Sequence, residues 1–281
     1  MNYLRKMYCV LALMSVQHAY SKWDVKKLEK NDAGQVAHGV KELSKLSLLG
    51  TERVLDVGCR AGKISQIIAQ EYVPNGHVDA IDKNPEMISL AQELTDQKNI
   101  TFACKDIYAL TSGKKYDVVT SFWSLHWEED YEQAIQGIAQ ATAEKGQALL
   151  CHVVGDDPLN TWAQRILEQD KWRAYKLQYK KNSHAPSLEK VVQAVSASGL
   201  SIEHFEVKKN GQWMPFEVAQ KNILSMPLFS FMPEEKREEF CADVMKGIMS
   251  EVSVASPGQF YYSLPVAVLS LKKNKNSGEK V

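Results

Sequence analysis

The segment from Val54 to Gly62 constrains the fold of this chain more than any other. A short apolar run reaches Asp56, and a turn with glycines at Gly58 and Gly62 leads into Lys63–Ala69, whose apolar residues have helical spacing. The pattern predicts a strand, a tight loop and a helix. Because the two glycines carry no side chains, backbone N–H groups can approach a nucleotide-like ligand there, and the helix N-terminus adds partial positive charge.

A second strand that ends in an acid is predicted at His77–Asp82. Asp82 lies 24 residues after Gly58, where a strand–helix–strand unit places the tip of its second parallel strand. A carboxylate at this position can accept hydrogen bonds from both ribose hydroxyls of a bound nucleoside. The next helix is predicted to begin with Asn84 as its N-cap and Pro85 at its first helical position.

Strands and helices continue to alternate along the chain. Further strands are predicted at Ile100–Cys104, Tyr116–Phe122 and Ala148–Val153, with helical segments between them. This alternation is typical of an α/β fold with a Rossmann-like, doubly wound parallel sheet, whose ligand lies beyond the carboxyl ends of the strands. We expect this core to extend from about Leu43 to Val154.

The motifs resemble the class I S-adenosylmethionine (SAM) methyltransferases. The resemblance rests on the glycine loop, Asp82, Asp106-Ile107 and the segment Ser121-Phe122-x-x-Leu125-His126-Trp127. Within that family, Leu-His-Trp resembles the trans-aconitate and juvenile-hormone-acid methyltransferase group, which methylates small carboxylic acids. Trp23-Asp24 and Gln35 resemble that group's N-terminal segment. The resemblance covers residues 22–273 and implies a SAM-dependent methyltransferase that acts on a small-molecule acceptor.

The same resemblance assigns roles to individual residues. Asp82 is expected to hold the ribose, Asp106 and the Ile107 N–H to lie near the adenine, and Trp127 to wall the acceptor cavity. His126 is either a general base or a structural histidine. The full set of expected cofactor residues is Gln35, Asp56, Gly58, Cys59, Arg60, Gly62, Asp82, Lys83, Asp106, Ile107, Ser121 and Phe122.

Arg60 departs from the family pattern, which has glycine at this position of the loop. Its side chain could crowd the carboxylate of the methionine portion, or its guanidinium could pair with that carboxylate. This departure, with Leu28 and Asp32 upstream, leaves open a catalytically weak or inactive binding protein that keeps the methyltransferase fold.

Methyl transfer from a sulfonium needs alignment of the reacting atoms and exclusion of water. A carboxylate acceptor, with a pKa near about 4, is already ionised and needs no general base. The absence of an obvious acid–base pair therefore favours O-methylation of a carboxylic acid. An amine or phenol acceptor would profit from a base, for which His126 is the candidate. The glycine spacing argues against a dinucleotide-dependent dehydrogenase.

The C-terminal half is predicted to insert helical or lid-forming segments into this domain. They are the helical stretch 159–179, the segment 212–232, which is rich in Trp, Met and Phe, and a helix at 233–252. The 212–232 segment is either a helix-packing surface or a lid over an apolar acceptor.

Composition restricts the remaining function classes. The 34 basic and 34 acidic residues balance, so charge gives no case for a nucleic-acid partner. The five cysteines are isolated, which indicates neither a disulfide framework nor a metal site.

Residues 1–21 read either as a signal peptide for export or as an N-terminal extension, and no other run is long enough to span a membrane. Because SAM is made in the cytosol, we expect a cytoplasmic protein, with residues 274–281 as a disordered tail.

Overall fold

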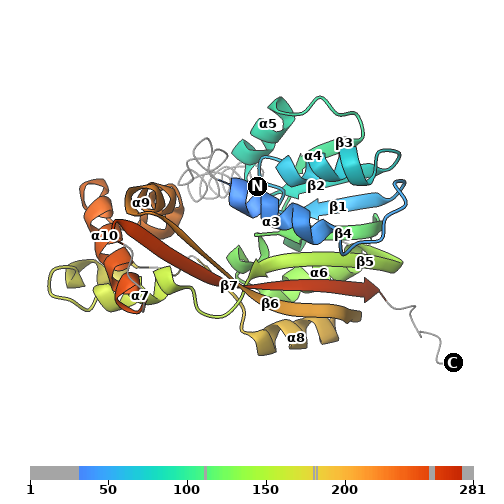
Figure 1. The fold of residues 1–281 in the computed structure, drawn as a ribbon. Helices are drawn as coiled ribbons and strands as arrows, with labels where there is room; N and C mark the ends of the chain where they lie inside the picture. Colours follow the sequence, from blue (N-terminus) through green and yellow to red (C-terminus); the bar gives the residue numbers. More distant parts are fainter. Residues whose placement is uncertain (1–31, 111–112, 180, 182, 253–256, 274–281) are drawn as a thin grey trace, which may run out of the picture. The chain divides into compact units, whose positions relative to one another are not determined.

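The computed structural model describes residues 32–110, 113–179, 181, 183–252 and 257–273. The predictions for residues 1–21, for Trp23, Asp24 and Leu28, and for the tail at 274–281 lie outside the described residues. The chain divides into two compact units (Figure 1). The sheet unit comprises residues 32–161, 183–212 and 261–273, and the helical unit comprises residues 162–182 and 213–260.

Seven strands form the central sheet in the order β3-β2-β1-β4-β5-β7-β6. Strands β1 to β5 pair in parallel, and β7 runs antiparallel to β5. This arrangement confirms the predicted α/β, doubly wound fold. The strands are β1 (Arg53–Val57), β2 (His77–Asp82), β3 (Ile100–Cys104), β4 (Tyr116–Phe122), β5 (Thr142–Val153), β6 (Leu200–Pro215) and β7 (Gln259–Lys273).

Helices cover both faces of the sheet unit. One buried apolar cluster includes Leu43 of α3, Ile88 of α5 and Ile68, which follows α4; the other includes Ile135 of α6 and Val191 of α8. Because each face is covered, the strands are apolar on both sides, as parallel strands require. The helices are α3 (Ala33–Leu43), α4 (Lys63–Ile67), α5 (Pro85–Glu93), α6 (Tyr131–Ala141) and α8 (Leu188–Ala197).

Several element boundaries differ from those expected from the sequence. The Lys63–Ala69 helix is α4 only to Ile67, after which the chain continues as a wider π-helical turn over Ile68–Tyr72. Strand β5 begins at Thr142 rather than Ala148, and β6 is 16 residues long, from Leu200 to Pro215. Both lengths are set by the neighbouring strand in the sheet, which local sequence does not reveal.

The helical unit has its own aromatic core. The indole of Trp172 packs edge-on against Phe240, with ring centroids 5.2 Å apart, and donates a hydrogen bond to Asp243 at 3.0 Å. Leu228, Phe229 and Met232 are buried, so the segment rich in Trp, Met and Phe supplies much of this core. The unit contains α9 (Phe216–Leu224), α10 (Glu234–Ser250), the 3-10 turns Arg173–Gln178 and Pro227–Phe229, and the end of α7 (Pro158–Ile166).

Candidate cofactor site

The glycine loop after β1 lies against the ends of two neighbouring strands. The N–H groups of Gly58 and Cys59 donate to the Ile81 carbonyl of β2 at 2.8 and 3.0 Å. Gly58 has a φ of 74°, and a Cβ there would lie 2.0 Å from the Ser124 hydroxyl oxygen. Only glycine therefore allows the loop to lie this close to the segment that follows β4.

Asp56 holds the start of the glycine loop in place through two hydrogen bonds. Its carboxylate, only 2% exposed, accepts hydrogen bonds from Ser65 Oγ of α4 at 2.5 Å and from Thr120 Oγ1 of β4 at 2.8 Å. Burial raises the pKa of Asp56 to about 6, although the two hydroxyl donors oppose the shift. The side chain thus connects β1, α4 and β4 beneath the expected ligand position.

Asp82 presents its carboxylate to the loop from the end of β2. Its Oδ2 accepts from the Arg60 N–H at 3.0 Å, and its Oδ1 accepts from the Asn84 N–H at 2.8 Å. Burial raises the pKa of this carboxyl group, and the two N–H donors partly offset that effect. Since each carboxylate oxygen has two acceptor positions, each keeps one for a ribose hydroxyl, so the residue fits the role predicted for it.

One pocket brings together much of the predicted cofactor set. The predicted residues among its lining are Gln35, Asp56, Gly58, Cys59, Arg60 and Phe122. The other lining residues were not predicted from the sequence as cofactor residues; they are Asp32, Val36, Ala61, Lys63, Ile64 and Trp123. Lys63 and Asp32 form an ion pair at 2.8 Å between the start of α4 and the residue before α3.

Arg60 points its side chain into this pocket. Its φ of 53° is in the left-handed region that glycine favours, and its Nη1 donates to Gln35 Oε1 of α3 at 2.5 Å. Burial lowers the pKa of the guanidinium, whereas the nearby charges of Asp32 and Asp82 favour its charged form. One residue therefore joins the glycine loop, the Asp82 carboxylate and α3.

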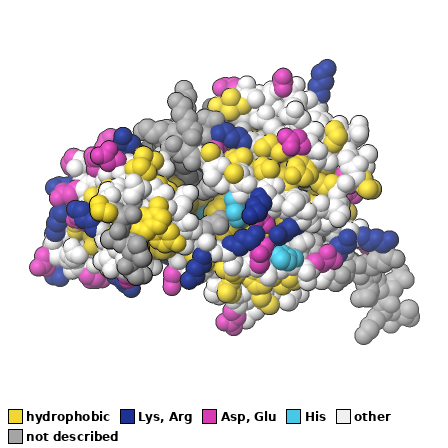
Figure 2. All heavy atoms as spheres, in the orientation of Figure 1, with side chains coloured by type: hydrophobic (Ala, Val, Ile, Leu, Met, Phe, Trp, Pro, Cys, Tyr) yellow, Lys and Arg dark blue, Asp and Glu magenta, His cyan; other side chains and the backbone are white. Residues whose placement is uncertain are grey.

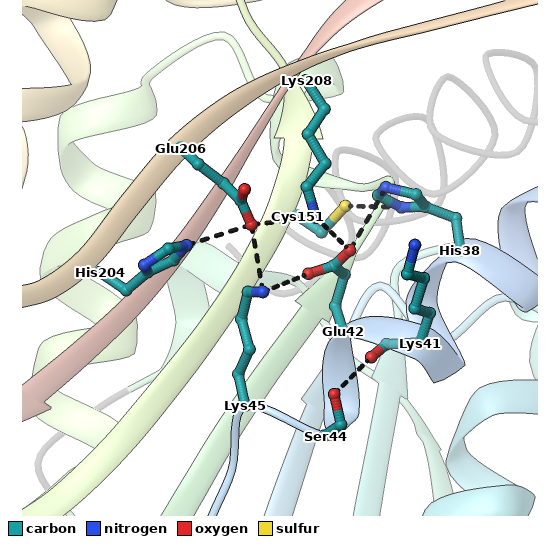
Figure 3. A network of polar contacts seen from close by, with 9 residues as sticks. All are labelled: His38, Lys41, Glu42, Ser44, Lys45, Cys151, His204, Glu206 and Lys208. Atoms are coloured by element: carbon teal, nitrogen blue, oxygen red, sulfur yellow. Dashed lines mark hydrogen bonds and ion pairs between the residues drawn. The ribbon is translucent and has the colours of Figure 1, made fainter.

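Helix α3 is anchored to the sheet by a network of charged side chains (Figure 3). Glu42, which is 1% exposed, pairs with Lys208 of β6 at 2.8 Å and with Lys45 at 3.1 Å. Burial opposes ionisation of Glu42, but the hydrogen bonds from Lys208 and Lys45 outweigh it and lower the pKa. Glu206 bridges the same two lysines at 3.1 and 2.9 Å. The network fixes the C-terminal end of α3, and the first turn of the same helix carries Gln35 at the pocket.

Half of the predicted cofactor residues lie outside the lining of this pocket: Gly62, Asp82, Lys83, Asp106, Ile107 and Ser121. Lys83 pairs with Glu128 at 3.0 Å, and Asp106 accepts a hydrogen bond from the Tyr108 N–H at 2.9 Å, which caps the turn Ile107–Ala109. Ile107 is buried. Gly62 also has a packing role, because a Cβ there would lie 2.5 Å from the Phe102 ring.

The acceptor-side residues His126 and Trp127 follow β4, and His152 lies near the end of β5. His126 is 6% exposed, and burial, with a smaller contribution from His152, lowers its pKa to about 3. The ring of Trp127 lies beside it, with centroids 5.0 Å apart. His152 was not predicted from the sequence; its Nε2 lies 3.0 Å from the Tyr131 hydroxyl, and burial lowers its pKa to about 3 as well.

Three polar atoms near these strand ends are buried without a hydrogen-bond partner among the described residues. They are Ser121 Oγ, His126 Nδ1 and His152 Nδ1. Both imidazoles are neutral at ordinary pH, so they act there as neutral donors or acceptors and not as charges.

Trp123 is the pocket residue that the sequence analysis missed most clearly. It follows Phe122 directly, has a φ of 57°, and its indole Nε1 is buried without an acceptor among the residues described. Its ring lies edge-on to His38 of α3, with centroids 5.5 Å apart. Its position one residue beyond a predicted strand end was the available signal.

The described residues form neither a membrane-spanning helix nor a cluster that could bind a metal ion. None of the helices they form is long and apolar enough to cross a membrane, and they contain no group of three His, Cys, Asp or Glu residues that could hold a metal ion. On the face seen in Figure 2, acidic and basic side chains are interspersed.

Residues 50–220 match the family described as "Methyltransferase domain". The chain belongs to this family. The assignment confirms the predicted SAM-dependent methyltransferase of class I, with SAM as its cofactor. The free acceptor positions of Asp82 and the glycine loop fit that cofactor.

Relatives of this methyltransferase cover different shares of the chain. The 235L protein of Invertebrate iridescent virus 6 is 24% identical over 86% of the chain and 91% of its own length. Juvenile hormone acid O-methyltransferase of Bombyx mori is 29% identical, over 53% of the chain and 54% of that enzyme. Malonyl-[acyl-carrier protein] O-methyltransferase of Bacillus cereus is 32% identical, over 31% of the chain and 32% of that enzyme.

Solved structures agree with the fold. Mycolic acid cyclopropane synthase CmaA1, in complex with S-adenosylhomocysteine (SAH) and CTAB, has a TM-score of 0.56 at 14% identity, over 88% of this chain and 85% of that one.

Proposed function

We propose that this methyltransferase transfers the methyl group of SAM to the carboxylate oxygen of a small organic acid. The observation that carries the proposal is the state of His126. This residue is the predicted candidate for a general base, yet burial lowers its pKa to about 3 and leaves it a very weak base. An acceptor that is already ionised needs no proton removed, and a carboxylic acid meets that condition above about pH 5.

The protein's task in such a reaction is positioning. The bound cofactor supplies a methyl group on a positively charged sulfur, which is a good leaving group. Asp82 would hold the ribose, and Asp56 would keep the loop in place through Ser65 and Thr120. Trp127 would wall the acceptor cavity and help to exclude water.

The names of two relatives support a carboxylate acceptor. Juvenile hormone acid O-methyltransferase and malonyl-[acyl-carrier protein] O-methyltransferase both carry O-methylation in their names. These alignments span about half of the first enzyme and about a third of the second. The main support for a carboxylate acceptor is therefore that it needs no general base.

We also propose that the acceptor is medium-sized and has an apolar portion, and that the protein works in the cytoplasm, where SAM is made. The indole of Trp127 supports the apolar portion. The 212–232 segment gives less support than its composition indicates, because Leu228, Phe229 and Met232 are core residues of the helical unit.

The test is an acceptor screen with SAM labelled on its methyl group. The panel pairs each carboxylic acid with an amine, an alcohol and a phenol of similar size, and includes protein and nucleic acid. Methyl esters are distinguished by release of labelled methanol in mild base. The Asp82→Ala variant serves as the control for transfer that depends on the cofactor site.

We expect base-labile label on the acids alone, at a rate that is flat from about pH 6 to pH 9 because the acceptor is ionised throughout. Label confined to amines, or a rate that rises with pH, would contradict the proposal. Absence of SAM binding at millimolar concentration would instead favour an inactive binding protein.

A further inference from the structure

We propose that Arg60 is the receptor for the α-carboxylate of the cofactor's amino-acid portion, with the Trp123 indole N–H as a second donor. The inference rests on the proposed cofactor role of this pocket. It assigns a binding function to the residue that departs from the family's glycine, and it makes the site selective for nucleosides that carry an amino-acid tail.

The first observation is that the one described side chain that accepts a hydrogen bond from the Arg60 guanidinium is neutral. A guanidinium has five N–H donors, and the acceptor that it contacts is the neutral amide oxygen of Gln35, at 2.5 Å. It forms no ion pair with a residue that the structure describes. A half-buried guanidinium that lines a pocket and has N–H donors to spare can bind an anionic ligand.

The neighbouring carboxylates are already engaged. Asp32 accepts from Lys63 at 2.8 Å, and the two oxygens of Asp82 accept the N–H groups of Arg60 and Asn84. These acids therefore favour the charged form of Arg60 from a distance without forming an ion pair with its guanidinium. Lys63, the other cation that lines the pocket, differs in having a carboxylate partner.

Trp123 provides the second, independent observation. Its indole Nε1 is buried and has no acceptor among the described residues, and its side chain lines the same pocket as Arg60. Its φ of 57° adds a second non-glycine residue with left-handed backbone at this site. The spare guanidinium donors of Arg60 and the unpaired indole N–H of Trp123 therefore belong to residues that line one pocket, which favours a ligand with an acceptor group there.

The geometry places this acceptor next to the ribose. The backbone N–H of Arg60 contacts Asp82, while its side chain reaches Gln35 of α3, so one residue spans from the ribose position to the helix. In SAM, the amino-acid portion is attached to the ribose through the sulfur. A planar carboxylate there matches the fork of a guanidinium, and Gln35 Oε1 holds Arg60 until the ligand binds.

The test compares two ligands that differ in this tail. SAH carries the amino-acid portion, and 5′-methylthioadenosine has the same nucleoside and thioether without it. Their dissociation constants are measured by calorimetry for the wild-type protein, Arg60→Gly, Arg60→Lys and the matched control Lys63→Met. Glycine is suited to a φ of 53°, so Arg60→Gly relieves backbone strain. Binding of 5′-methylthioadenosine reports whether each variant keeps a folded pocket.

We expect Arg60→Gly to weaken SAH binding by about 10- to 100-fold and to leave 5′-methylthioadenosine binding unchanged. Arg60→Lys should retain part of the SAH affinity, and Lys63→Met should affect the two ligands equally. Unchanged or tighter SAH binding in Arg60→Gly, or an equal loss for both ligands, would overturn the inference while the cofactor site stands. A wild-type protein that binds neither ligand would overturn the cofactor site and the inference together.

Discussion

Replacement of Asp82 by alanine tests the cofactor site most directly. Each carboxylate oxygen of Asp82 already accepts one backbone N–H and retains one acceptor position, so the variant would remove the acceptors for both ribose hydroxyls. Hydrogen bonds to a charged group contribute about 1.5–3 kcal/mol, which corresponds to a loss of SAM affinity of about 10- to 150-fold. Calorimetric titration with SAM at pH 7.5 measures this loss.

The same substitution affects the fold less than the affinity. The N–H groups of Arg60 and Asn84 lose their acceptor, but water entering the pocket can replace it, and removal of the buried carboxylate ends its own desolvation. We expect the free energy of unfolding to fall by about 1 kcal/mol in urea titrations.

Asp79→Ala is the matched control for Asp82→Ala. Asp79 lies on the same strand but pairs with Lys114, whereas Asp82 contacts the glycine loop through the Arg60 N–H, so loss of Asp79 should leave SAM affinity unchanged. Wild-type SAM affinity in Asp82→Ala would refute the ribose role. An equal loss in Asp79→Ala would attribute the effect to the strand rather than to the site.

Three further predictions concern the loop, the acceptor side and α3. Folding raises the pKa of Asp56 from 3.8 to about 6, so protonation of Asp56 stabilises the folded state. This contribution to the free energy of unfolding is fully present below about pH 4 and is lost as the pH rises through 6. The free energy of unfolding of Asp56→Asn, measured relative to wild type in urea titrations, should therefore rise by up to about 3 kcal/mol between pH 4 and pH 7. A difference between the two proteins that does not change with pH would contradict this. Trp127→Ala should lower turnover far more than SAM affinity in kinetic and calorimetric measurements, because it removes alignment of the acceptor; equal losses of affinity and stability would identify Trp127 as a core residue. Glu42→Ala should destabilise the protein by about 2 kcal/mol, since it removes the buried partner of Lys45 and Lys208 and leaves Glu206 as the acid that they share, and an unchanged urea midpoint would show that Glu42 contributes nothing to stability.

The sequence was most informative where local chemistry determines the structure. The bounds of β3 and β4 are those predicted, and Asn84 caps α5 through a hydrogen bond from the Glu86 N–H to its side chain at 2.9 Å. The positions of Gly58 and Asp82 follow from the loop pattern and the spacing of a strand–helix–strand unit. In each case the evidence lies within about 30 residues of chain.

Features that depend on distant partners were not predictable in the same way. The side chains of Lys208 and Glu42 are 166 positions apart in the sequence, and only the fold brings β6 to α3. The lowered pKa of His126 comes from burial by the whole domain. Whether Arg60 blocks or completes the pocket depends on Gln35 and Trp123, which the glycine motif does not include.

The place of β7 in the sheet has a consequence for synthesis of the protein. Strand β7 follows β6 in the sequence but inserts between β5 and β6 in the sheet. Until residues 259–273 have left the ribosome, β5 has an unpaired edge and β6 lacks its neighbour, although β1 to β5 can already pair with one another. An exposed apolar edge of this kind promotes aggregation. A chain that stops before Gln259 should therefore need chaperones throughout its life, whereas a chain that includes β7 needs them only until residues 259–273 emerge.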